Sequence, residues 1–237
     1  MNLSCKELKR QARETLNGRY GLPMGTYVTA GLIVLAVTFP FNYSYQKNPD
    51  VLQSVIYSLA TVIISLLSIV LSCGIIRIQL DMARGKEKTF ADLFYYFGKR
   101  PDRLIFAQLL MILIFFVAMI PVTACAICSV LFYSKALLTL TVILTVATTV
   151  LICYLSLTFG LIYFFLVDNE TIGVIAAYRL SLAHMRGNRG RLLYIRLSFI
   201  GMELLCLFSF GIGVLWIAPY INQTVVAFYR NTIGEVS

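Results

Sequence analysis

The sequence predicts an all-α fold: a polytopic transmembrane helical bundle of about six helices, with short amphipathic helices on the cytoplasmic side. Of its 237 residues, 59% are hydrophobic and only 13% are charged, whereas a soluble domain is about one-quarter charged. The charges are clustered, which leaves apolar runs of about 20 residues or more, enough to cross a hydrocarbon core as helices. The alternating pattern of membrane barrel strands is absent. These observations together indicate a helical membrane protein.

The first segment, residues 1–21, has the pattern of an amphipathic cytoplasmic helix. Leu8, Ala12 and Leu16 recur at helical spacing among basic side chains. Ser4 and Glu7 match a capping box, and Asn17-Gly18 supplies a stop signal. We expect this helix to lie on the membrane surface, held by its apolar stripe and by anionic lipid. A solvated leader is the alternative.

A single transmembrane domain, 22–230, is expected to follow, and 231–237 form a cytoplasmic tail. The predicted helices are 22–41, 51–76, 104–133, 136–167, 192–210 and 214–230. Only the segment "GIG" at 211–213 separates the last two, so five crossings are the alternative to six. Pro219 interrupts the sixth helix.

The basic residues predict the orientation of these helices. Eighteen of the 20 Lys and Arg residues fall on one side of the six-helix threading, and only Lys47 and Lys135 fall on the other. Because Lys and Arg accumulate in cytoplasmic loops, both termini are expected to be cytoplasmic in a multi-pass protein of the cell membrane. This asymmetry accounts for the net charge of +9, so no nucleic-acid partner is predicted.

Two basic segments resemble each other. Residues 77–85 read "RIQLDMARG" and residues 179–187 read "RLSLAHMRG". They are either copies of an internal repeat or basic loops that converged in composition. Both suit a short surface helix that ends at glycine, with arginines that reach the lipid phosphates. The candidate lipid-facing residues are Arg77, Arg84, Arg179, Arg186, Arg189 and Arg191.

Glu203 lies within the predicted fifth helix. An ionisable group within a membrane costs about 2.5–3.5 kcal/mol unless it is paired or hydrated. We therefore expect Glu203 to pair with Arg196, or with Asn222 and Gln223 beyond Pro219. Glu203, Asn222 and Gln223 form a candidate intramembrane polar site, which either serves an ion or joins helices.

The sequence predicts no catalytic, cofactor-binding or metal-binding residue and no cofactor. His184 is the only histidine and has no nucleophile or carboxylate at a recognisable spacing. Cys125 and Cys128 have CxxC spacing within an apolar run, where small packing residues are the favoured interpretation. Asp168-Asn169-Glu170 is expected to cap the helix that follows it.

Several motifs resemble a known family in the same order. They are "ELKRQARETLNGRYG" near the start, then "IAAYRLSLAHMRGNRGRLLYIRLSFIGMELL", "FGIGVLWIAPY" and "TVVAFY". The chain resembles a bacterial family of integral membrane proteins catalogued as domain of unknown function 975. It is also similar to the membrane domain attached to some glycerophosphodiester phosphodiesterases. The family often has tryptophan where this chain has Met202-Glu203. The resemblance implies several crossings of a bacterial cytoplasmic membrane and no known activity.

Taken together, these patterns favour a non-enzymatic membrane module. Its basic cytoplasmic face would contact anionic lipid or partner proteins, and the protein could associate with itself or with another membrane protein. A small transporter or channel that uses Glu203 and the broken sixth helix is the first alternative. A lipid-modifying membrane enzyme is the second.

Overall fold

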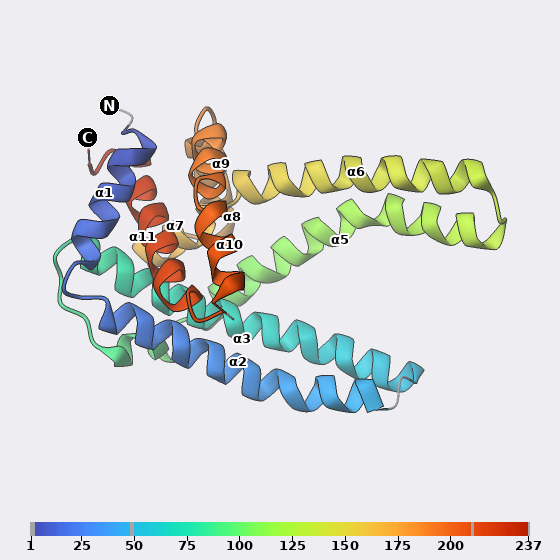
Figure 1. Ribbon diagram of the computed structural model, residues 1–237, viewed down its shortest axis with the longest axis horizontal. Helices are drawn as coiled ribbons and strands as arrows, with labels where there is room; N and C mark the ends of the chain where they lie inside the picture. The colour runs from blue at the N-terminus through green and yellow to red at the C-terminus, as the bar shows by residue number, and fades with distance from the viewer. Residues whose placement is uncertain (1–2, 48–49, 210, 237) are drawn as a thin grey trace.

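Two long helical hairpins extend in the same direction from one end of the protein (Figure 1). The computed structural model describes residues 3–47, 50–209 and 211–236. The first hairpin pairs α2 (Gly21–Lys47) with α3 (Val51–Ala83), and the second pairs α5 (Pro101–Leu131) with α6 (Lys135–Thr158). Both chain termini lie at the opposite end from the hairpin tips (Figure 1).

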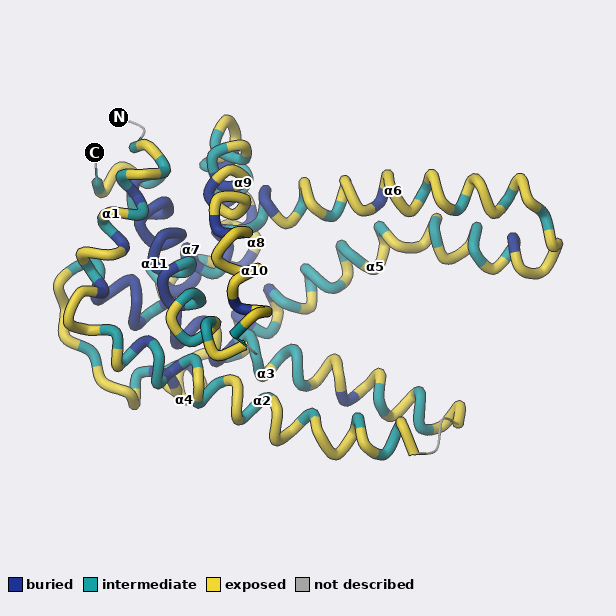
Figure 2. The backbone as a smooth tube through the Cα atoms, viewed as in Figure 1, coloured by how far each residue is buried: buried dark blue, intermediate teal, exposed yellow. Residues whose placement is uncertain are grey.

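The hairpins have the length and composition of membrane spans. Four helical segments qualify within the described ranges: Gly21–Lys47, Val51–Ala83, Pro101–Leu131 and Lys135–Asp168, where the last also contains α7. Their apolar side chains are largely unburied (Figure 2), as for Leu32 at 60% exposure and Leu113 at 55%. Such surfaces are stable in lipid rather than in water. The predicted all-α membrane fold is therefore confirmed.

The remaining helices gather at the base of the hairpins and form what we call the body (Figure 1). They are α1 (Cys5–Leu16), η1 (Phe90–Phe94), α4 (Tyr95–Gly98), α7 (Ile162–Asp168), α8 (Val174–Met185), α9 (Arg189–Leu197), α10 (Ile200–Phe208) and α11 (Val214–Thr232). Buried residues are concentrated in the body (Figure 2). At its centre α11 packs against α1, α2, α3, α9 and α10, and it buries Val226, Phe228 and Tyr229.

A glycine brings the loop after the first hairpin close to α3. An added Cβ at Gly74 would collide with the backbone carbonyl of Leu93 in η1. Leu93 itself is fully buried, in a small core with Leu71, Ile75 and Ile78 of α3. The absence of a side chain at Gly74 thus allows η1 to pack directly on the α3 backbone.

The N-terminal helix forms as predicted but faces protein. The Ser4 hydroxyl accepts a hydrogen bond from the Glu7 amide, and Gly18 adopts a left-handed φ of +72° after the last turn. Leu8, Ala12 and Leu16 are all buried, and α1 packs on α11. The expectation that this apolar stripe lies on lipid is wrong, because α11 already presents an apolar surface to it.

The predicted fourth, fifth and sixth crossings differ from the structure. The fourth, 136–167, is interrupted at 159–161, where Gly160 packs against Leu192. The fifth, 192–210, is instead the separate helices α9 and α10, each of 9 residues. A helix of that length spans only about 14 Å, less than half of a hydrocarbon core. The sixth corresponds to α11, whose C-terminal half is buried in the body. Neither of these last two predicted crossings is among the four qualifying spans.

Candidate functional site

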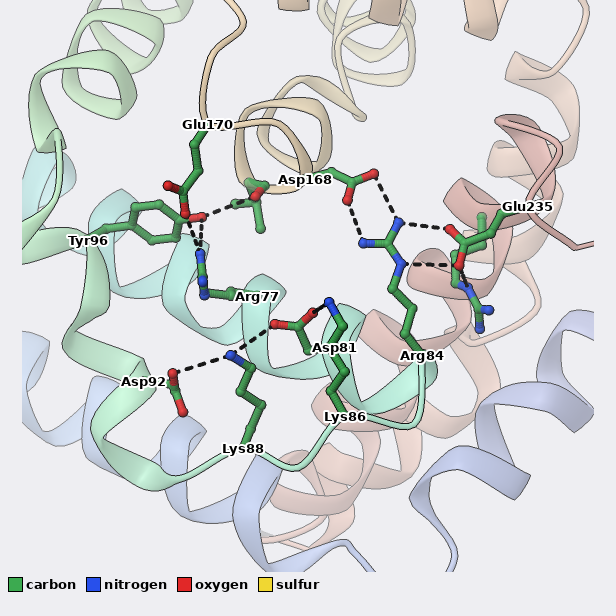
Figure 3. Close-up of polar contacts among 12 residues, drawn as sticks. Arg77, Asp81, Arg84, Lys86, Lys88, Asp92, Tyr96, Asp168, Glu170 and Glu235 are labelled. Atoms are coloured by element: carbon green, nitrogen blue, oxygen red, sulfur yellow. Dashed lines mark hydrogen bonds and ion pairs between the residues drawn. The ribbon is translucent and has the colours of Figure 1, made fainter.

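A charged network lies where the two hairpins meet the body (Figure 3). It combines the end of α3, the loop after it, η1, the α7–α8 junction and the C-terminal residues. We use the name charged network for ten side chains joined by ion pairs: Arg77, Asp81, Arg84, Lys86, Lys88, Asp92, Asp168, Glu170, Arg230 and Glu235.

Arg84 joins two acidic groups that are remote in sequence. Its guanidinium donates to both carboxylate oxygens of Asp168 and to both oxygens of Glu235. Tyr229 donates its hydroxyl to Asp168 at 2.9 Å, and Arg230 donates to Glu235 at 3.0 Å. The Arg84 and Asp168 side chains are only 23% and 20% exposed, so solvent screens this pair weakly. The hydrogen bond from Arg84 holds the pKa of Glu235 below its ordinary value.

Arg77 makes a second link from α3 to the same junction. Its Nη1 lies 2.7 Å from Glu170, and its guanidinium stacks 3.6 Å from the centre of the Tyr95 ring. Tyr95 also donates its hydroxyl to Glu170, at 2.9 Å. The hydrogen bonds from Arg77 and Tyr95 lower the pKa of Glu170, which is therefore a carboxylate at neutral pH.

Lys88 links α3 to η1. Its Nζ lies 3.1 Å from Asp81 and 3.5 Å from Asp92. Asp92 in turn accepts a hydrogen bond from the Thr89 amide, which caps the start of η1. The loop after α3 is thus fixed at both ends by carboxylates.

The charges of the network balance, because it contains five basic and five acidic side chains. A polar cleft of about 250 Å³ lies among Arg77, Arg84, Asp168 and Glu170. With each cation next to a carboxylate, this arrangement is suited to hold α3 of the first hairpin against α7, which continues the second. Sequence reasoning missed this role: Arg77 and Arg84 were expected to face lipid, and they bind carboxylates instead. Asp168 and Glu170 were expected to cap the next helix, whose N-cap residue is Gly173.

Polar side chains make a further junction between α3 and α11. The buried Gln79 amide donates to the Pro219 carbonyl and accepts from Asn222, while Gln223 donates to the Gln79 carbonyl. Glu203 is not part of it: its side chain is exposed on α10 and has no hydrogen bond or ion pair within the described ranges. The predicted pairing of Glu203 with Arg196, Asn222 or Gln223 is therefore wrong, since Asn222 and Gln223 join helices.

Glu203 instead borders an apolar cleft between α10 and α11. The cleft has a volume of about 560 Å³, and its other walls include Cys206, Val214 and Ile217. His184 does not line this cleft. Its Nδ1 lies 2.9 Å from the Leu180 carbonyl, and its ring lies beside Phe165.

The second basic segment has different surroundings from the first. Arg179 and Arg186 are exposed, and neither side chain has a hydrogen bond or ion pair among the described residues. Arg189 stacks on Tyr154 of α6, 4.5 Å from the ring centre. Arg191 donates to the Leu3 carbonyl and to Asn231, so it is an internal contact rather than a lipid-facing group.

The two cysteines with CxxC spacing, both on α5, are free thiols. Cys125 and Cys128 are both partly buried, and Cys125 accepts a hydrogen bond from Thr141 on the opposite helix. No group of three His, Cys, Asp or Glu side chains in the described ranges is arranged to hold a metal ion.

Two apolar hairpins of membrane-spanning length on a helical body define a polytopic α-helical membrane protein. The chain belongs to the family described as Protein of unknown function (DUF975), whose model matches residues 1–235. No curated protein and no solved structure matches the chain.

Proposed function

We propose that the protein is a non-enzymatic, multi-pass module of a bacterial cell membrane, whose basic cytoplasmic body binds anionic lipid. One contrast carries this proposal. The two similar basic segments differ in their partners: Arg77 and Arg84 bind carboxylates, whereas Arg179 and Arg186 are exposed without an internal partner in the described ranges. Exposed arginines of this kind are available to phosphate groups.

The position of the second segment supports lipid as the partner. Helix α8, which carries Arg179, packs against α5 and α6 where they leave the body. Ile175, one turn before Arg179 on the same helix, is 60% exposed. Arg189 beside Tyr154 of α6 adds an arginine and an aromatic ring at the same level. Apolar, aromatic and basic side chains together are typical of the headgroup region.

The orientation follows from the charge distribution. The two hairpins cross the membrane four times, so both termini and the body share one side. Lys47 and Lys135 lie at the far ends of the hairpins, and the other 18 basic residues are on the side of the body. This asymmetry favours a cytoplasmic body.

The test compares lipid selectivity in proteoliposomes. Spin-labelled phosphatidylglycerol and phosphatidylcholine report the fraction of each lipid that the full chain immobilises. The wild type is expected to prefer phosphatidylglycerol, and Arg179→Gln with Arg186→Gln should weaken that preference. Each basic residue near the surface contributes about 1 kcal/mol of attraction to anionic lipid.

The matched control removes two charges from the other side of the membrane. Lys47→Gln with Lys135→Gln should leave the preference for phosphatidylglycerol added to the body-side leaflet unchanged. Equal immobilisation of the two lipids by the wild type would overturn the proposal, as would an equal effect of the two double variants.

A further inference from the structure

A cavity at the start of the second hairpin is lined by three basic side chains and by the carboxylate of Glu170. It has a volume of about 260 Å³ and lies between the end of α4 and the first turn of α5. Its lining includes Lys99, Arg100, Arg103, Leu104, Leu166 and Glu170. None of the three basic residues belongs to the charged network.

The partners of the lining residues show where the excess charge comes from. Among the described residues, Arg103 donates to the backbone carbonyls of Asn169, Glu170 and Ile172 and to no carboxylate, so its full charge remains. Lys99 and Arg100 are exposed, and within the described ranges neither side chain forms an ion pair. Glu170 is the acidic group of the lining; it is paired with Arg77 and also attracts Lys99 electrostatically. Among the described lining residues, three cations therefore face one carboxylate that Arg77 already shares, so positive charge is in excess.

The cavity lies beside the first turn of a candidate membrane-spanning helix. Helix α5 begins at Pro101 and is long and apolar enough to span a membrane. Phe94 and Phe97, just before the cavity in sequence, are 41% and 44% exposed, as aromatic residues at the headgroup level often are. An entry of α5 into the membrane beside these aromatic residues would place the cations near the lipid phosphates.

An apolar stripe continues from the cavity along α5. Phe106, Leu109 and Leu113 are 52%, 43% and 55% exposed, and their spacing places them on the helix face that begins with Arg103. From Arg103 to Leu113 the helix rises by about 15 Å, which is comparable to one leaflet of the hydrocarbon core. A molecule with an anionic head in the cavity could lay an acyl chain on this stripe.

We propose that this cavity binds the phosphate group of an anionic phospholipid, with Lys99, Arg100 and Arg103 around the phosphate and one acyl chain along Phe106, Leu109 and Leu113. The inference deepens the proposed function and rests on it, because it assigns one defined lipid site to a body that faces anionic lipid. Arg103, held in place by three carbonyls, provides a pre-oriented guanidinium, and Lys99 adds a point charge.

The experiment measures the first phosphatidylglycerol bound to the full chain in detergent micelles by native mass spectrometry. Lys99→Gln with Arg100→Gln removes two exposed charges. At about 1 kcal/mol for each basic residue, it should weaken the affinity for this first lipid about 30-fold. Lys99→Arg with Arg100→Lys keeps both charges and should retain most of the affinity, which separates loss of charge from misfolding.

A second arm identifies the source of the phosphate. Glycerophosphoglycerol carries the same phosphodiester without acyl chains, and it should not displace bound phosphatidylglycerol at equal concentration. Displacement at equal concentration would overturn the lipid assignment and indicate a site for soluble phosphate esters.

The pair Arg179→Gln and Arg186→Gln separates this inference from the proposed function. It should reduce the general preference for anionic lipid and leave the first, tightest site intact. One outcome is that Lys99→Gln with Arg100→Gln leaves the affinity for the first phosphatidylglycerol unchanged while the wild type still prefers this lipid. In that case the cavity assignment fails and the proposed function stands. If the wild type binds phosphatidylglycerol and phosphatidylcholine equally, both fail.

Discussion

Arg84 and Asp168 lie 84 residues apart in the sequence and form a two-point ion pair that ties the first hairpin to the second. Both side chains are about four-fifths buried. Asp168 also accepts the hydroxyl of Tyr229 from α11, so this one carboxylate contacts both α3 and the core of the body. The contact between the two hairpins therefore includes a charge that the sequence alone would assign to a helix cap.

Asp168→Asn tests this link. The amide keeps the size of the side chain and removes its charge, which leaves the largely buried guanidinium of Arg84 with fewer strong acceptors. We expect the free energy of unfolding to fall by about 1.5–3 kcal/mol, as for hydrogen bonds to charged groups. Chemical denaturation in detergent micelles measures it. Glu14→Gln is the control, because the exposed pair of Glu14 with Arg10 should contribute nothing measurable. Equal effects of the two changes would show that the network does not hold the hairpins.

Acidification should weaken the same network. The pKa values of Glu170 and Glu235 lie below the ordinary glutamate value because Arg77 and Arg84 donate to the charged carboxylates. The unfolded chain then binds protons first as the pH falls below about 4.3, so the free energy of unfolding decreases with pH in that range. The stabilisation is complete above the ordinary value and is lost as the pH falls through the two lowered pKa values.

The measurement is the unfolding midpoint as a function of pH in micelles. Glu170→Gln with Glu235→Gln should start less stable near neutral pH and lose less stability on acidification than the wild type. Parallel curves for the two proteins would contradict the assignment.

The contact of η1 with α3 gives a steric prediction. Gly74→Ala places a methyl group against the Leu93 carbonyl, and backbone atoms on both sides leave it little room to relax. We expect a loss of about 1–3 kcal/mol in the free energy of unfolding, the usual cost of overpacking. Gly31→Ala, in the middle of α2 with open space around its Cβ position, is the matched control. It should be neutral or stabilising by up to about 1 kcal/mol, since alanine favours helix over glycine. A larger loss at Gly31 than at Gly74 would refute the prediction.

The sequence predicted the hairpins well because lipid sets simple requirements. A run of apolar residues long enough to cross, bounded by charges, determines α2, α3, α5 and most of α6 almost without reference to the rest of the chain. The Ser4 cap and the Gly18 stop could also be predicted, because each depends on residues within one helical turn.

The body was less predictable because its helices are covered by protein. An apolar run looks the same whether lipid or another helix lies against it, so α1 and α11 were both assigned to the membrane or its surface. The charged network was missed for a related reason. Arg77 and Arg179 occupy matching positions in similar segments, and only the chain fold brings Glu170 to the first of them.

The number of crossings is the remaining difference with a direct test. The sequence favoured six, which would place 211–213 outside with Lys47 and Lys135, whereas crossing only by the two hairpins keeps 211–213 on the side of the termini. Helices α9 and α10 have 9 residues each, and Leu207 and Phe208 are 74% and 83% exposed. We therefore expect this apolar turn to dip into the near leaflet without crossing.

A biotin acceptor peptide, read by a ligase confined to the cytoplasm, distinguishes the two arrangements. Peptides inserted after Gly211 and at the C-terminus should both be biotinylated, whereas peptides after Lys47 and Lys135 should not. Both arrangements have an even number of crossings, so only the insertion after Gly211 separates them. If that peptide is protected like the one after Lys135, α10 and α11 cross the membrane. The body would then have to reorganise in lipid, because the contacts of α11 with α1 and α3 require all three helices to lie together.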